Sequence, residues 1–165
     1  MTDCSCTIYR RVSMNILFFL TPKSEVAFIY EDESLRQALD KMEYHKYSSV
    51  PVINRYGRYI GTITEGDMLW GIKNKFQLNL KEAETVPVTA IPRRMDYKPV
   101  RADARMEDMI DRALDQNFIP VVDDQKNFIG IIKRKDIIKY FYDKMGREER
   151  KTASAQGKRI VLAGV

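Results

Sequence analysis

The chain has 165 residues, of which 44% are hydrophobic and 31% charged, and its formal net charge is +5. With 8 Gly and 6 Pro, this composition excludes collagen-like, low-complexity and wholly disordered proteins. The positive charge gathers at the ends, because residues 1–13 carry +1 and residues 146–165 carry +3, which leaves +1 for the body. We therefore expect weak polyanion attraction at the tail and no basic surface for binding nucleic acid.

The first residues carry no pattern of a metal site, a secretion signal or a membrane span. Cys4 and Cys6 are the only cysteines and His45 is the only histidine, which is too few for a zinc site with four ligands. The longest apolar run near the start, residues 16–20, is shorter than the roughly 7–15 residues of a signal sequence or the ~20 of a membrane helix. We expect a cytoplasmic protein with reduced thiols, no membrane contact and a disordered arm over residues 1–13.

The body begins with a strand, helix, strand, strand, helix pattern. An extended segment, Val26–Tyr30, precedes a helix with Asp32 as its expected N-cap. The apolar residues of this helix recur at i, i+3, i+4 and i+7 and should face the core: Leu35, Ala38, Leu39 and Met42. A strand pair follows over Ser49–Ile53 and Tyr59–Ile63, joined by a tight turn, and a second helix is predicted over Glu65–Lys75.

The same pattern returns after a linking segment, residues 76–92, in which residues 81–84 predict a helical turn. Val50-Pro-Val-Ile53 recurs 69 residues later as Ile119-Pro-Val-Val122, and the same offset takes Asp67 to Asp136. The expected elements of this second unit lie over Lys98–Val100, the helical stripe Met106, Met109, Ile110 and Ala113 behind an N-cap at Asp103, Phe118–Val122, Phe128–Ile132 and Arg134–Lys144.

These units predict an α/β (α+β) fold of two βαββα repeats that pack with pseudo-twofold symmetry, because a sheet this small cannot cover itself alone. The predicted organisation is a disordered arm over 1–13, a first repeat over 14–75, a linker over 76–92, a second repeat over 93–145 and a basic tail over 146–165 that frays.

The repeats resemble the CBS domain family, whose tandem pairs are called Bateman modules. The resemblance rests on Ser48-Ser-Val-Pro-Val52 and Gly61-Thr-Ile-Thr-Glu-Gly-Asp67, and on the weaker copies Asn117-Phe-Ile-Pro-Val121 and Gly130-Ile-Ile-Lys-Arg-Lys-Asp136. A stand-alone pair is similar to the bacterial stand-alone members, some of which bind cyclic di-AMP. The resemblance implies two clefts for adenosine nucleotides, each built from both repeats, in which the aspartate accepts hydrogen bonds from the ribose.

The resemblance also implies the site residues. The first cleft would contain Asp67, Thr64, Lys98, Gln116 and Asn117. The second would contain Asp136, Lys133, Arg134, Thr21, Ala27, Tyr47 and Ser48. Lys133 departs from the family pattern, since a Ser or Thr is expected there. The cationic run from Lys133 to Lys135 at a helix start suits a phosphate, so the second cleft is favoured for polyphosphates or a dinucleotide.

Simpler interpretations stay open beside these assignments. Thr64 and Asp67 have the spacing of a helix capping box, although Asp136 persists where residue 133 has no hydroxyl. The Lys133–Lys135 run has the pattern of a solvated helix start, Arg93 and Arg94 that of an exposed surface, and Tyr47 that of a half-buried sheet tyrosine.

The sequence favours a sensor over an enzyme. It has one histidine, no cysteine in its body and neither a G-x-x-x-x-G-K-[ST] nor a G-x-G-x-x-G loop. We expect a non-catalytic module that requires no cofactor. It would bind AMP, ADP, ATP or cyclic di-AMP, form a homodimer and signal to a regulated protein partner. The alternatives are a scaffold whose basic tail binds polyanions, and a degenerate pair that only dimerises.

Overall fold

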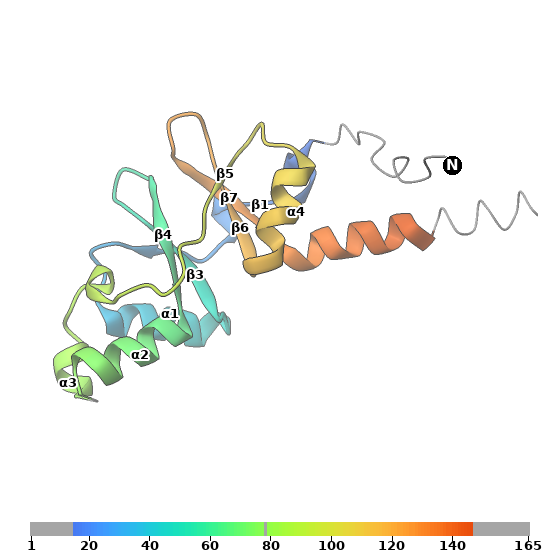
Figure 1. Cartoon of the computed structure of the whole chain (residues 1–165). Coiled ribbons are helices and arrows are strands. Elements are labelled where there is room, and N and C mark those ends of the chain that lie inside the picture. Colours follow the sequence, from blue (N-terminus) through green and yellow to red (C-terminus); the bar gives the residue numbers. More distant parts are fainter. Residues whose placement is uncertain (1–14, 78, 147–165) are drawn as a thin grey trace, which may run out of the picture.

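The computed structural model describes residues 15–77 and 79–146 (Figure 1). The predicted arm over 1–13 and residues 147–165 of the predicted tail lie outside the described residues. The helices are η1 (Ile16–Phe19), η2 (Lys23–Glu25), α1 (Leu35–His45), α2 (Glu65–Lys75), α3 (Leu80–Ala83), η3 (Val88–Ala90) and α4 (Met106–Asp115), followed by helix over residues 134–146. The strands are β1 (Leu20–Pro22), β2 (Ile29–Tyr30), β3 (Ser49–Ile53), β4 (Tyr59–Thr64), β5 (Val100–Arg101), β6 (Phe118–Val122) and β7 (Phe128–Lys133).

The described strands form two mixed sheets, which confirms the predicted α/β fold class. One sheet has the order β2-β3-β4 and the other the order β1-β7-β6-β5. In each, a parallel pair (β2 with β3, β5 with β6) adjoins an antiparallel hairpin (β3 with β4, β6 with β7). β1 was not predicted as a strand. It pairs with β7 of the second repeat, so the start of the first repeat belongs to the sheet of the second.

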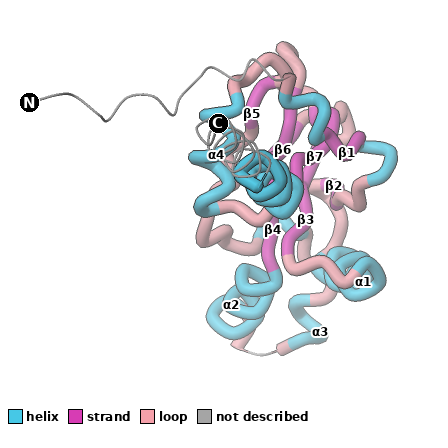
Figure 2. The backbone as a smooth tube through the Cα atoms, turned by 90° about the vertical axis from the view of Figure 1, so that its right-hand side faces the viewer, coloured by secondary structure: helices cyan, strands magenta, loops and turns pink. Residues whose placement is uncertain are grey.

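Each sheet buries one face against its own helices. The first core joins residues from β3 and β4 to Leu35, Ala38 and Met42 of α1, as the helical stripe predicts. Leu39 was predicted in the same stripe, but it is 37% exposed, because it lies at the margin of the buried face. In the second core, Met106 and Met109 of α4 pack on β6 and β7. Figure 2 shows the sheets in the middle of the molecule with α1, α2 and α3 at one end.

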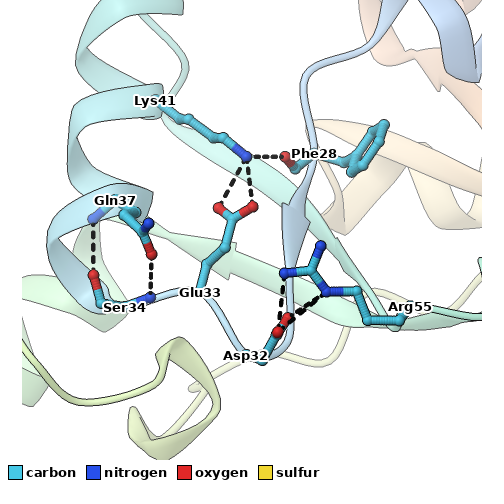
Figure 3. A network of polar contacts seen from close by, with 7 residues as sticks. All are labelled: Phe28, Asp32, Glu33, Ser34, Gln37, Lys41 and Arg55. Carbon is cyan, nitrogen blue, oxygen red and sulfur yellow. Dashed lines mark hydrogen bonds and ion pairs between the residues drawn. The ribbon is translucent and has the colours of Figure 1, made fainter.

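The predicted N-caps are wrong for both repeats. Ser34, not Asp32, caps α1: its hydroxyl accepts from the Gln37 amide N–H, and the Gln37 side chain accepts from the Ser34 N–H (Figure 3). Asp32 lies too far before the helix for a capping bond, and it accepts instead from Arg55 in the β3–β4 turn. Asp103 likewise pairs with Arg101, and α4 begins after residue 105.

Equivalent residues of the two repeats meet at the pseudo-twofold axis. Arg58 and Asn127, 69 residues apart, form an isolated antiparallel bridge. On either side of it the Tyr59 N–H donates to the Lys126 carbonyl (3.3 Å) and the Phe128 N–H donates to the Gly57 carbonyl (2.8 Å). Since residues 57 and 126, and 59 and 128, are also equivalent, this is one hydrogen bond made twice by symmetry. It holds the two hairpins side by side.

An apolar cluster joins the two repeats beside these hairpins. It contains side chains from both halves of the chain: Val26, Ile53, Tyr97, Phe118, Phe128 and Ile131. Ile53, Phe118, Phe128 and Ile131 belong to β3, β6 and β7, whereas Val26 and Tyr97 belong to the segments that precede β2 and β5. Burial of this cluster stabilises the pairing of the repeats and positions the segments that precede β2 and β5.

Candidate functional site

Asp67 lies at the junction between the two repeats, in the first turn of α2, and is only 2% exposed. Its Oδ2 accepts from the Thr64 backbone N–H (3.0 Å) and hydroxyl (2.8 Å), while the Asp67 N–H donates to the Thr64 hydroxyl oxygen (3.1 Å). This is a complete capping box, so the simpler interpretation of the Thr64 and Asp67 spacing is confirmed.

The other oxygen of Asp67 accepts a hydrogen bond from the segment at the start of the second repeat, before β5. The Arg94 backbone N–H donates to Asp67 Oδ1 at 2.9 Å. The neighbouring Arg93 side chain lies against Gly61, where a Cβ atom would collide with its guanidinium, and Arg93 Nη1 donates to the Ile60 carbonyl at 3.1 Å. Both arginine side chains are exposed, as the surface interpretation predicts, but the backbone contact to Asp67 was not foreseen.

The residues predicted to share the first cleft from the second repeat do lie together. The Gln116 side chain, 5% exposed, accepts from the Lys98 N–H (3.0 Å) and donates to the Lys98 carbonyl (3.4 Å). The Asn117 N–H donates to the Tyr97 hydroxyl at 3.4 Å. Lys98, Gln116 and Asn117 are thus joined around Tyr97, whose own carbonyl faces β4 of the first repeat.

Tyr59 makes the polar link from this group to the first repeat. Its hydroxyl donates to the Tyr97 carbonyl (2.9 Å) and lies 2.8 Å from the Thr62 hydroxyl. Burial raises the pKa of the Tyr59 hydroxyl, so this group stays protonated and able to donate. Sequence reasoning missed Tyr97 and Thr62, since nothing in their immediate neighbours distinguishes them. Their equivalents in the other repeat, Val26 and Ile131, are apolar.

Asp136 stands in a different environment from Asp67, although the two are equivalent by the repeat. It is half-buried, and none of the described residues gives its carboxylate a hydrogen bond or an ion pair. Lys133 and Arg134 are also half-buried and Lys135 is exposed. The Arg134 guanidinium donates to the Asn117 side-chain oxygen at 2.7 Å, so Asn117 contacts the second cleft as well as the first.

The other four residues predicted for the second cleft, Thr21, Ala27, Tyr47 and Ser48, make separate contacts. Thr21 lies on β1 opposite Ile131, two residues before Lys133. Tyr47 is 38% exposed and stacks on His45, with ring centroids 5.4 Å apart. Ser48 accepts at its carbonyl from the Glu65 N–H (3.1 Å), which ties it to the start of α2. Ala27 is half-buried. Within the described part of the chain, no hydrogen bond connects these four residues to Asp136.

A small pocket lies beside β4, on the edge of the first sheet. Its volume is about 70 Å³, and it is lined by Val52, Ile60, Ile63, Val88, Thr89, Ile91 and Arg93. Ligand pockets typically measure ~300–1,000 Å³, so this one is too small for a nucleotide. None of the residues predicted for the first cleft lines it.

The family model for the CBS domain matches this chain twice, over residues 19–74 and 88–143. The chain belongs to the CBS domain family. The two matches cover both βαββα units, and they establish the tandem CBS pair that the repeated motifs predict.

Known relatives of this CBS pair include both proteins and solved structures. The chain is 25% identical over 142 residues to the uncharacterised protein MJ1225 of Methanocaldococcus jannaschii; the match covers 79% of this chain and 50% of that protein, so the chain spans half the length of this relative. A structure of CbpB in complex with c-di-AMP has a TM-score of 0.72 at 24% identity, covering 84% of this chain and 91% of that one. A structure of CBSX2 in complex with AMP has a TM-score of 0.63 at 22% identity, covering 78% and 96%. At these identities the two structures establish the shared fold.

None of the helices in the described residues combines the length and the apolar character of a membrane span. These residues also contain no group of three or more His, Cys, Asp or Glu side chains arranged to hold a metal ion.

Proposed function

We propose that this CBS pair is a non-catalytic regulatory module that binds an adenine nucleotide between its repeats and transmits the bound state to a protein partner. The ligands considered are AMP, ADP, ATP and cyclic di-AMP. Similar folds have been solved with AMP and with c-di-AMP, which supports this ligand class.

The observation that carries the proposal is that each repeat contributes a segment of chain that contacts the other repeat near its aspartate. The first segment of the second repeat contacts Asp67 of the first repeat, through the Arg94 N–H. The first strand of the first repeat, β1, pairs with β7 of the second repeat, which ends three residues before Asp136. A molecule beside either aspartate would therefore touch both repeats. Its binding would favour one mutual arrangement of the repeats, as a signal to a partner requires.

Asp136, Lys133 and Arg134 are the residues we assign to the nucleotide in the second cleft. An ionised carboxylate is a strong acceptor for the two hydroxyls of a ribose, and it donates nothing in return. Lys133 and Arg134 stand at the start of a helix, where free N–H groups and the positive end of the helix dipole also favour a phosphate.

The test is a thermal unfolding panel on the full chain with AMP, ADP, ATP, NAD, S-adenosylmethionine and cyclic di-AMP, and with GMP as the matched control. A ligand at one hundred times its dissociation constant stabilises the native state by ~2.7 kcal/mol. We expect a selective rise in melting temperature with one or more adenine nucleotides and none with GMP. Melting temperatures unchanged by every ligand would leave a degenerate pair that has lost its ligands.

Homodimerisation and a cytoplasmic location belong to the same proposal. Large apolar side chains stand exposed on two helices, Leu69 (57%) on α2 and Ile138 (59%) and Tyr142 (78%) on the helix over residues 134–146. Pairing of two copies would bury them. Size-exclusion chromatography with light scattering tests this directly, and a monomer at high concentration would contradict it.

A further inference from the structure

Asp67 and Asp136 occupy equivalent positions of the two repeats, but within the described residues only the carboxylate of Asp67 accepts hydrogen bonds. Both oxygens of Asp67 are engaged: Oδ2 by Thr64 and Oδ1 by the Arg94 N–H. Asp67 is also only 2% exposed, so neither of its carboxylate oxygens faces solvent. Asp136 is half-buried, and its carboxylate has no partner in the described residues. A ribose can therefore approach the carboxylate of Asp136 directly, whereas at Asp67 the Arg94 backbone already occupies the oxygen that a ribose would bind.

The segment that covers Asp67 is attached at two points. The Arg94 N–H binds the carboxylate, and the Arg93 guanidinium binds the Ile60 carbonyl beside Gly61. In the second repeat the corresponding edge of β7 is covered by β1, whose backbone lies against Gly130. In the described residues the first sheet has three strands, and β4 is the last of them. At the edge of β4 the Arg93 side chain donates to the Ile60 carbonyl, and the side chains around the small pocket pack beside it.

A side-chain contact of this kind is easier to displace than a paired strand. Arg93 is exposed and its guanidinium is the flexible end of a long side chain, whereas β1 contributes backbone to the second sheet. An N–H donating to a carboxylate is the same interaction that a ribose hydroxyl makes, so the Arg94 N–H and a ribose compete for one oxygen.

We propose that the Arg93–Arg94 segment is an internal competitor that closes the first cleft, so that the nucleotide occupies the Asp136 cleft first and reaches Asp67 only when this segment moves. The inference rests on the proposed function, since it concerns the same nucleotide. The segment leads into β5, so its release loosens the connection between the repeats. Occupation of the first cleft would therefore change the arrangement of the repeats more than occupation of the second.

The test is isothermal titration calorimetry of the full chain with AMP, comparing Arg94→Pro with Arg94→Ala. Proline removes the N–H that binds Asp67, while alanine keeps it, so the pair isolates this one donor. We expect one AMP per chain for the parent and for Arg94→Ala. For Arg94→Pro we expect a second AMP, or at least a tenfold tighter second site. Arg93→Ala, which removes the contact to Ile60, provides a second route to the same result if the proline variant does not fold.

A further variant separates this inference from the function on which it rests. Asp136→Ala should weaken the single site of the parent by about 10- to 150-fold, and Asp136→Ala combined with Arg94→Pro should bind one AMP in the first cleft at least tenfold more tightly than Asp136→Ala alone. Two equal sites in the parent, or identical titrations for Arg94→Pro and Arg94→Ala, would overturn the inference and leave the proposed function standing. If no variant bound AMP, ATP or cyclic di-AMP, both would fail.

Discussion

Tyr59 and Phe128 stack across the pseudo-twofold axis, with ring centroids 6.2 Å apart and an angle of 26° between the ring planes. They occupy equivalent positions of the two repeats, yet only Tyr59 carries a hydroxyl. That hydroxyl is hydrogen-bonded to the Tyr97 carbonyl and to the Thr62 hydroxyl. The centre of the interface is therefore polar on one side and apolar on the other. This difference makes the two clefts chemically unequal.

Tyr59→Phe should lower the free energy of unfolding by about 1–3 kcal/mol, because it leaves the stack intact but deprives the Tyr97 carbonyl of its donor. Urea unfolding measures the loss. Tyr56→Phe is the matched control, since Tyr56 is 87% exposed and its hydroxyl should contribute nothing. Equal stability of the parent and Tyr59→Phe would show that this hydrogen bond does not join the repeats.

Thr64→Ala should destabilise the protein by about 0.5–2 kcal/mol, the usual contribution of an N-cap hydroxyl. The hydroxyl both accepts from the Asp67 N–H and donates to the Asp67 carboxylate, so its loss weakens two bonds of the capping box. Lys133→Ala, at the equivalent position in the second repeat, removes no hydroxyl and serves as the comparison. A Thr64→Ala protein as stable as Lys133→Ala would argue against the cap.

Gly61→Ala and Gly130→Ala should have unequal effects although the glycines are equivalent. At Gly61 the added methyl group meets the Arg93 guanidinium, which can swing into solvent. At Gly130 it meets the Thr21 carbonyl and the Pro22 backbone, so β1 must separate from β7. We expect ~1–3 kcal/mol of destabilisation at Gly130, as for overpacked sites, and clearly less at Gly61. Thermal and urea unfolding of the two variants test this ranking.

Acid should weaken the β6–β7 hairpin through Asp123. Hydrogen bonds from the Asn127 side chain and from the backbone of Asn127 and Gln125 hold the pKa of the Asp123 carboxyl below its ordinary value of 3.8. Because the folded pKa is the lower one, this contribution to stability is complete above pH 3.8 and is lost as the pH falls through the folded value. Asp123→Asn should reduce the pH dependence of unfolding in that acid range. If NMR titration gave the Asp123 carboxyl a pKa at or above 3.8, these hydrogen bonds would not be the source of the acid sensitivity.

Asp136→Ala should weaken AMP binding by about 1.5–3 kcal/mol, the contribution of charge-assisted hydrogen bonds. Lys133→Ala should weaken ligands in proportion to their phosphate charge, so that ATP loses most and adenosine almost nothing. Calorimetric titrations with adenosine, AMP and ATP separate the two effects. Equal losses for adenosine and ATP in Lys133→Ala would exclude a phosphate contact.

The repeat and its elements could be predicted because their signals are local. Ser49–Ile53 and Phe118–Val122 are strands with the predicted bounds, and α2 spans Glu65–Lys75 as expected. Apolar periodicity and turn residues lie within a few positions of one another in such segments, so the sequence displays them directly. β1 escaped prediction because it is three residues long and its partner, β7, lies more than a hundred residues away.

The sequence alone was sufficient for the tandem repeat, the fold class and the Thr64–Asp67 capping box, whose partners are three residues apart. Tertiary structure alone decided that Arg94, 27 residues beyond Asp67, occupies its second carboxylate oxygen, and that Asp136 keeps its carboxylate free of the described residues. Local bonds follow from spacing along the chain, since helix geometry fixes the distance between close neighbours. Contacts between the repeats depend on how two whole sheets pack, and no short segment of sequence specifies that arrangement.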